Sequence, residues 1–125
     1  MPTICFFEIP ANDIEKMRKF YSELFNWRIE KDENQTEYEY WMIDTAALSC
    51  RDGIKGAIEK RQDPQQKIII WISVPSVEEY SNKIEKLGGK VFVSKTAVVG
   101  MGYYAYCLDP ENNYFAIWEP NENAE

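Results

Sequence analysis

Apolar residues recur three and four positions apart in two segments of the chain, which is the spacing of one face of an α-helix. The second segment repeats the spacing of the first 63 positions later, from Ile14 to Val77. Each segment follows a short run of branched and aromatic residues, 4–9 and 68–74, typical of a half-buried strand. The pattern therefore predicts a strand and then a helix, written twice. The two helical stripes consist of Ile14, Met17, Tyr21, Leu24, Val77, Tyr80, Ile84 and Leu87.

Residues suited to helix ends flank both stripes. Asp13 precedes the first stripe, and Ser76 with Glu79 precedes the second, so side-chain oxygens can accept the free amides of each first turn. Asn26 and Gly88 follow the stripes, and both residue types tolerate the left-handed conformation that closes a helix. The sequence thus predicts both ends of both helices.

Three further strand-like runs follow each helix. Each half therefore reads β-α-β-β-β, in an α+β chain of two repeats, about 1–62 and 66–120. Because a module of about 60 residues buries too little surface for comfortable stability alone, we expect one domain over residues 1–125. The runs are 27–30, 37–43 and 56–59, then 90–94, 102–108 and 114–118, and the loops between elements are 31–35, 61–66 and 109–113.

The composition is that of an ordinary globular protein, with 45% hydrophobic and 28% charged residues. No apolar run approaches the roughly 20 residues that cross a bilayer, so we expect no membrane association. The N-terminus enters the first strand without a basic segment and an apolar stretch, which favours the cytoplasm. A formal charge of −7 with scattered Lys and Arg argues against nucleic acid as a partner.

The chain contains no histidine and three cysteines, Cys5, Cys50 and Cys107. These cysteines have no CxxC spacing, so they resemble buried small hydrophobic residues more than ligands or nucleophiles. We therefore expect structural thiols.

Several short segments occur together in this chain: 7–13, Phe20-Tyr21, 24–27, 102–105 and the D-P-E-N-N turn at 109–113. Together they resemble the vicinal oxygen chelate superfamily, which includes glyoxalase I, bleomycin-resistance proteins and extradiol dioxygenases. The resemblance covers essentially the whole chain. It implies two βαβββ modules whose strands curl into a half-open, cup-shaped mixed sheet with the helices outside and the active site within.

The resemblance also implies positions for metal ligands. They fall on Phe6 and Ile69, on Ala116 near the end of the chain, and near Gly56 in the first repeat. None of these side chains offers a nitrogen, oxygen or sulfur donor, and a divalent ion needs about three protein ligands. We therefore expect no metal and no cofactor, and no metal-dependent glyoxalase or dioxygenase activity.

Strand alternation predicts what lines the cup instead. If Phe6 faces inward, so do Ile4 and Glu8, whereas Cys5, Phe7 and Ile9 face the helix. Trp71 is the second-repeat counterpart of Glu8, at the offset of 63. The same face is expected to hold Ile69, Ser73, Tyr104, Tyr106, Tyr114 and Trp118. The predicted ligand-binding residues are Phe6, Glu8, Trp71, Tyr104, Tyr106 and Trp118, with Glu8 as the candidate catalytic residue.

Three functions follow from these expectations. One is a metal-free binding protein that takes a small aromatic or cationic organic molecule in the cup, or in the cleft of a homodimer. Another is a metal-independent lyase, isomerase or hydrolase in which Glu8 is the base and Tyr104 or Tyr106 donates a proton. The remaining one is a structural or regulatory interaction domain with a collapsed cup, in which these aromatic residues, with Tyr38, Tyr40 and Trp41, only pack a core.

Overall fold

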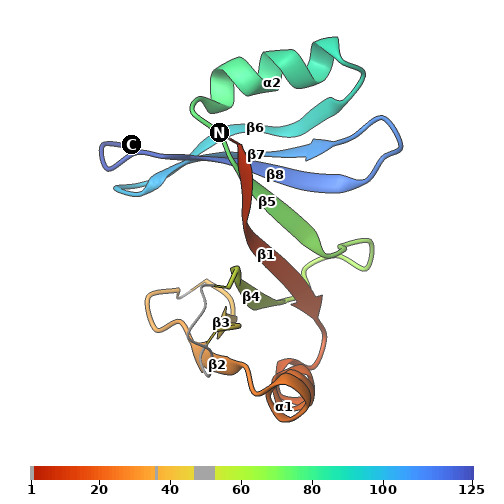
Figure 1. Cartoon of the computed structure of the whole chain (residues 1–125), viewed down its shortest axis with the longest axis vertical. Helices are drawn as coiled ribbons and strands as arrows, with labels where there is room; N and C mark the ends of the chain where they lie inside the picture. The colour runs from red at the N-terminus through yellow and green to blue at the C-terminus, as the bar shows by residue number, and fades with distance from the viewer. Residues whose placement is uncertain (1, 36, 47–52) are drawn as a thin grey trace. The chain divides into compact units, whose positions relative to one another are not determined.

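Figure 1 shows a computed structural model of the chain, which describes residues 2–35, 37–46 and 53–125. The elements follow the predicted order, strand, helix and three strands, in each repeat. In sequence they are β1 (Thr3–Ala11), α1 (Ile14–Phe25), β2 (Arg28–Lys31), β3 (Tyr40–Asp44), β4 (Lys55–Lys60), β5 (Ile69–Ser73), α2 (Val77–Lys86), β6 (Lys90–Val98), β7 (Gly102–Leu108) and β8 (Tyr114–Pro120).

The chain divides into two compact units. The first half is Phe6–Ile68, and the second half is Ile69–Glu125 together with the residues before Phe6. Strands of the first half lie in the order β2-β3-β4-β1, and those of the second in the order β5-β8-β7-β6. In both halves the strand that precedes the helix pairs in parallel with the last strand, and the other strand pairs within each half are antiparallel. The predicted α+β class with two βαβββ repeats is confirmed, while the prediction of a single domain stays a prediction.

Both helices begin and end at the predicted signals. The carboxylate of Asp13 accepts the amide of Lys16 at 3.0 Å, and the hydroxyl of Ser76 accepts the amide of Glu79 at 3.1 Å. Asn26 ends α1 with φ of 58°, and Gly88 follows α2 with φ of 96°. The second helix start has an additional partner, because Oε1 of Glu119 accepts the Val77 amide at 2.9 Å.

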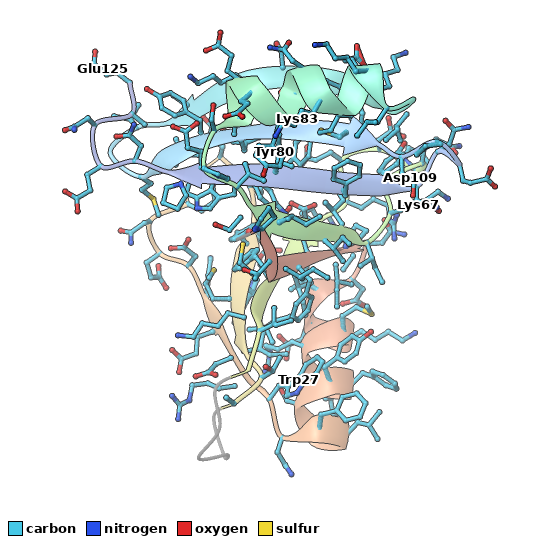
Figure 2. The ribbon with its side chains drawn as sticks, turned by 45° about the horizontal axis from the view of Figure 1, so that its top comes forward. Trp27, Lys67, Tyr80, Lys83, Asp109 and Glu125 are labelled. Carbon is cyan, nitrogen blue, oxygen red and sulfur yellow. The ribbon has the colours of Figure 1, made fainter. Side chains whose placement is uncertain are left out.

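Each half builds its core between its helix and one face of its own strands. Figure 1 shows α2 running along β6 in the second half, and α2 also packs on β7 and β8. Figure 2 labels Tyr80 and Lys83 of α2, and the Lys83 ammonium lies 4.7 Å from the centroid of the Tyr80 phenol ring. The first core contains Ile9, Ala11, Ile14, Ile29, Ile43 and Ile58, and the second contains Val74, Val77, Ala105, Cys107 and Ile117.

Two strands differ from their predicted bounds by three residues or more. Residues 37–39 do not join β3, because the segment before the strand turns and the Glu37 amide donates to the Gln35 side chain at 3.0 Å. Strand β6 continues to Val98, beyond the predicted end at residue 94, and pairs with β7 through register shifts between Val91 and Thr96. Such irregular pairing breaks the alternation by which strand length is judged from sequence.

The predicted D-P-E-N-N turn is present between β7 and β8. Oδ1 of Asp109 accepts the amides of Glu111 and Asn113, both at 2.9 Å, and Asn112 takes a φ of 65°. These hydrogen bonds hold the pKa of the Asp109 carboxyl below its usual range. Across the described part of the chain, the helices are too short and too polar to cross a membrane.

Candidate functional site

Strand alternation leaves one sheet face of each half uncovered by its own helix. In the first half Phe7 and Ile9 pack in the core beneath α1, which turns Phe6 and Glu8 to the opposite face. In the second half Ile72 packs in the core with α2, which turns Trp71 to the opposite face. The predicted facing of Phe6, Glu8 and Trp71 relative to the helices is therefore correct.

The uncovered face of the first half carries two buried carboxyl groups. Glu8 is 5% exposed and Glu59 is 8% exposed. Their strands run side by side, since Pro10 of β1 pairs with Glu59 of β4, and Tyr40 of β3 pairs with Glu59 on its other side. The Tyr40 hydroxyl donates to Oε2 of Glu8 at 2.5 Å, and the Gln66 amide donates to Oε1 of Glu59 at 2.6 Å. We call Glu8, Tyr40, Glu59 and Gln66 the polar cluster.

Burial and like charge change the acidity of this cluster. Burial, with the neighbouring Glu8 charge, raises the pKa of Glu59 to about 7, although the Gln66 hydrogen bond opposes the shift. Burial and the charge and hydrogen bond of Glu8 also raise the pKa of the Tyr40 phenol, so it keeps its proton and remains a donor. The cluster thus combines a fixed phenol donor, an acceptor carboxylate and a carboxyl that titrates near neutrality.

The uncovered face of the second half carries aromatic rings. The Trp71 ring centroid lies 5.8 Å from that of Tyr104, 5.7 Å from that of Tyr106 and 6.3 Å from that of Trp118. Phe92 of β6 stacks on Tyr106 at 6.1 Å. The four predicted residues of this half, Trp71, Tyr104, Tyr106 and Trp118, are brought together, and all four are half-buried. We call these four residues and Phe92 the aromatic face.

Strand pairing shows that the polar cluster and the aromatic face occupy equivalent positions. In the first half Ala57 pairs with Glu8 on one side and with Met42 on the other. In the second half Ala116 pairs in the same way with Trp71 and with Tyr106. Two residues along the same strands, Tyr40 pairs with Glu59 in the first half, and Tyr104 pairs with Trp118 in the second.

Both alanines are fully buried and end at Cβ, which leaves room above them. In the first half the Glu8 side chain reaches Tyr40 across this space, and in the second the Trp71 ring reaches Tyr104 and Tyr106.

Sequence reasoning missed Glu59 and Gln66, and it treated Tyr40 only as an aromatic residue of uncertain facing. The internal repeat contained the signal for Glu59. Trp118 was placed on the aromatic face, and its repeat counterpart in β4 is Glu59. The predicted proton donors for Glu8 were Tyr104 and Tyr106. The phenol that contacts Glu8 within its own half is Tyr40, and the assignment of Tyr104 and Tyr106 to Glu8 stays a prediction.

The cysteine prediction is correct at one position and wrong at another. Cys107 is fully buried, and burial together with the charge of Glu85 raises the pKa of its thiol to about 11, as expected of an inert thiol. Cys5 is exposed and is not among the residues of the first core. Its thiol donates to the Trp71 carbonyl at 3.6 Å. Cys50 lies outside the described residues.

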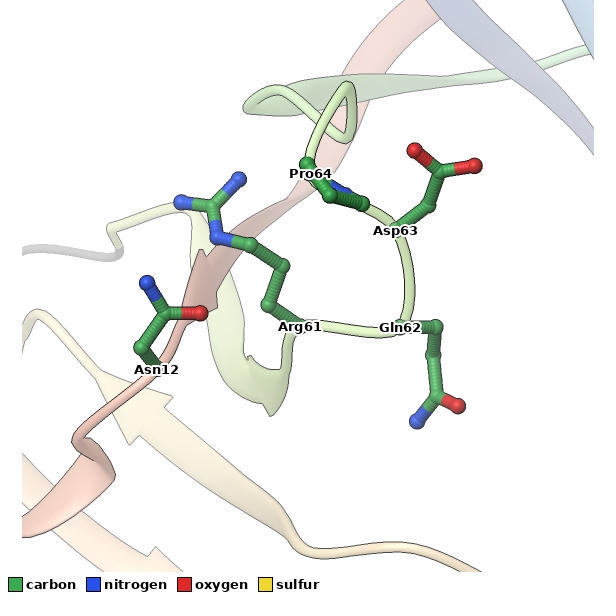
Figure 3. A pocket seen from close by; sticks show the side chains of 5 residues that line it. All are labelled: Asn12, Arg61, Gln62, Asp63 and Pro64. Atoms are coloured by element: carbon green, nitrogen blue, oxygen red, sulfur yellow. The ribbon is translucent and has the colours of Figure 1, made fainter.

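A shallow pocket of about 500 Å³ lies where the chain leaves the first repeat. In Figure 3 the side chains of Arg61 and Asn12 lie on one side of the loop, while Gln62 and Asp63 point away from them. The Arg61 guanidinium donates to the Gln66 carbonyl at 2.5 Å and to the Pro10 carbonyl at 3.4 Å. Arg61 therefore anchors the loop to β1.

Comparison with known proteins identifies the family. The family model described as the Glyoxalase/Bleomycin resistance protein/Dioxygenase superfamily matches residues 3–117. The chain belongs to this superfamily. The predicted resemblance to vicinal oxygen chelate proteins is confirmed.

Individual superfamily relatives are distant. A glyoxylase-like domain-containing protein from Didymella fabae is 28% identical over 115 residues, which is 88% of each chain. A hypothetical protein from Bacillus halodurans C-125 superposes with a TM-score of 0.68 at 15% identity, over 99% of this chain and 98% of its own. Methylmalonyl-CoA epimerase from Mycobacterium tuberculosis superposes with a TM-score of 0.66 at 8% identity, over 94% and 87%. These two solved structures share the fold.

The superfamily resemblance implies a metal, and the residues at the implied positions do not fit one. The side chains of Phe6, Ile69 and Ala116 are hydrocarbon and contain no donor atom. The first-half counterpart of Ala116 is Ala57 rather than Gly56, because it pairs with Glu8 as Ala116 pairs with Trp71, and it is equally without a donor. Over residues 2–35, 37–46 and 53–125, no three His, Cys, Asp or Glu side chains gather as a metal site would require.

Proposed function

We propose that this protein binds a small organic molecule that carries an aromatic ring, a positive charge or both, and that the aromatic face is its stacking surface. The supporting observation is the half-buried Trp71 ring with three aromatic neighbours at 5.7 to 6.3 Å on a face its own helix does not cover. Indole and phenol rings attract planar ligands by offset stacking and cations through their electron-rich faces.

Charge favours the same class of ligand. The formal charge of −7 attracts cations and repels anions over the surface as a whole. The phenol hydroxyls of Tyr104 and Tyr106 can orient a bound molecule by hydrogen bonding. In the first half, Phe6 and Glu8 remain our expected contacts for this ligand, and a homodimer whose cleft contributes to binding remains part of the proposal.

Three probes separate the contributions of ring and charge. Proflavine is a planar aromatic cation, p-cresol a neutral ring and tetramethylammonium a cation without a ring. We expect proflavine to raise the melting temperature most, since a ligand that binds only the folded state stabilises it. By calorimetry, Trp71→Leu should weaken proflavine binding about tenfold, which corresponds to about 1.4 kcal/mol.

Phe20→Leu is the matched control, because Phe20 is an exposed ring on α1 of the first half, 55% accessible. Its removal should leave the affinity unchanged. Equal losses in the two variants, or no stabilisation by any of the three probes, would contradict the proposal. Light scattering should give twice the monomer mass of 14.7 kDa if the homodimer is correct.

A metal-independent acid–base enzyme is the second candidate, and a specific contact favours it. Glu8 is buried and accepts a hydrogen bond from the Tyr40 phenol at 2.5 Å, which is the geometry of an oriented carboxylate base. The donor in this candidate is Tyr40 of the same half, while Tyr104 and Tyr106 were the residues named from sequence.

The test of this candidate is Glu8→Gln, which keeps the shape of the side chain and removes its basicity. For any substrate found by screening, we expect turnover to fall at least about 100-fold, the usual contribution of a general base, with unchanged ligand affinity. Added EDTA should have no effect on the rate. Full turnover by Glu8→Gln would exclude Glu8 as the base.

A further inference from the structure

The burial of Glu8 and Glu59 on one sheet face is unusual, because buried carboxyl groups are stable only when they are hydrogen-bonded, paired or protonated. They lie on adjacent strands, β1 and β4, and Pro10, the register partner of Glu59, is two residues from Glu8. Side chains two residues apart on a strand share a face, so both carboxyls point to the same side. Each is oriented by a neutral donor, Tyr40 for Glu8 and Gln66 for Glu59.

Among charged groups, Glu8 acts on the pKa of Glu59 and raises it. Strand β1 contributes Glu8, strand β3 contributes Tyr40, and the segment before β3 contributes Tyr38, which influences the Tyr40 phenol electrostatically. The loop after β4 contributes Arg61, whose guanidinium donates to two backbone carbonyls. Like charges buried together cannot both ionise without a large electrostatic cost.

We propose that Glu8 and Glu59 form a proton-holding pair, in which Glu59 carries one proton at slightly acid to neutral pH while Glu8 stays ionised against the Tyr40 hydroxyl. The raised pKa of Glu59 agrees with this assignment, since its causes are burial and then the Glu8 charge. The pair then presents one negative charge when Glu59 is protonated and two when the proton is lost.

This state has a chemical use that neither carboxyl has alone. A protonated and an ionised carboxyl side by side provide a proton donor and a proton acceptor on the same face. The device also sets how strongly the face attracts a cation, because the second negative charge appears only as the pH rises through neutrality. It exists whether or not the aromatic face binds a ligand.

The direct test is a carbon-13 NMR titration of the glutamate side-chain carboxyls in the ligand-free, full-length protein. We expect one resonance to titrate with a midpoint about 7, and the variant Glu59→Gln to remove that resonance. Glu8→Gln should lower its midpoint by about one pH unit or more, since the neighbouring negative charge is gone. Glu30→Gln is the matched control, an exposed glutamate on β2 of the same half, and should leave the midpoint unchanged.

Three results would overturn the pair. One is a Glu59 resonance that titrates at the ordinary glutamate value of about 4.3. Another is a midpoint that Glu8→Gln leaves unmoved. The last is an equal shift in Glu30→Gln, which would indicate a general effect of net charge. Since no ligand is present, a failed proflavine screen would reject the proposed binding function and leave this test intact.

Discussion

In the first half the sheet face away from α1 carries two buried carboxyls and a phenol, whereas in the second half the equivalent face carries two indoles and two phenols. The strand pairing beneath them is the same, with Ala57 and Ala116 at matching points. The difference therefore lies in the side chains and not in the backbone. The chemistry of this face is determined by the side chains at these strand positions, because the fold provides the same backbone positions in both halves.

The largest expected effect tests whether the two cores are as alike as their pairing suggests. Ile58 and Ile117 occupy equivalent positions beside the two alanines and are 0% and 2% exposed. Replacing either with alanine should lower the free energy of unfolding by about 2–5 kcal/mol, because each leaves a cavity. Urea denaturation measures both. A loss below about 1 kcal/mol in only one variant would show that the halves pack differently.

The next effect compares the loss of one tyrosine hydroxyl in each half. Tyr40→Phe removes one hydrogen bond to the buried Glu8 carboxyl and should cost about 1–3 kcal/mol. The equivalent change, Tyr104→Phe, keeps the ring contacts with Trp71 and Tyr106 and should stay within about 0.5 kcal/mol. Equal costs in urea denaturation would mean that the Tyr40 hydrogen bond does not distinguish the halves.

The pH dependence of stability is the third comparison. The pKa of Glu59 is raised in the folded protein from 4.5 to about 7, so the folded state binds the proton more tightly than the unfolded state. Its stabilising contribution is complete below pH 4.5 and is lost as the pH rises to about 7. Glu59→Gln should therefore melt a few degrees above the parent protein at pH 8, and this advantage should shrink at pH 5.

Glu30→Gln provides the reference for this measurement, since the same charge is removed from an exposed position in the same half. An advantage of Glu59→Gln that is equal at pH 5 and pH 8 would refute the raised pKa.

The smallest expected effect concerns the helix starts, where the two halves should behave alike. Asp13→Ala and Ser76→Ala each remove one hydrogen bond to a first-turn amide, at 3.0 and 3.1 Å. Each should cost about 1 kcal/mol in urea denaturation. A much smaller loss for Ser76→Ala would show that Glu119, which accepts the Val77 amide, is sufficient to hold the start of α2.

Local signals made most of the fold predictable. The helix stripes, the caps at Asp13 and Ser76 and the left-handed residue Asn26 act over three or four neighbouring residues, which a sequence displays directly. The bounds of β3 were less accurate, because the turn at Gln35 that precedes it depends on side-chain hydrogen bonding. Family membership followed from several such local segments spread over the chain.

The candidate site was predictable only where alternation alone decides the facing. Phe6, Glu8 and Trp71 were placed correctly because a period of two fixes the face once Phe7, Ile9 and Ile72 are assigned to the cores. Glu59 ends the short predicted strand at 56–59, and no residue of that run indicates that its carboxyl is buried. The burial of Glu59 depends on strand β1, which is distant in sequence, and on Gln66, which follows in the next loop. Patterns among neighbouring residues do not show such contacts.

Ala57 and Ala116 occupy equivalent positions in the two halves, and their small side chains accept very different neighbouring side chains. Neither alanine contributes a functional group, and both make room for long side chains from the strands on either side. The two halves carry a carboxyl and an indole, Glu8 and Trp71, at equivalent positions of the same strand pairing. A duplicated scaffold of this type can acquire new binding chemistry by single substitutions, one repeat at a time, while the other repeat retains its own.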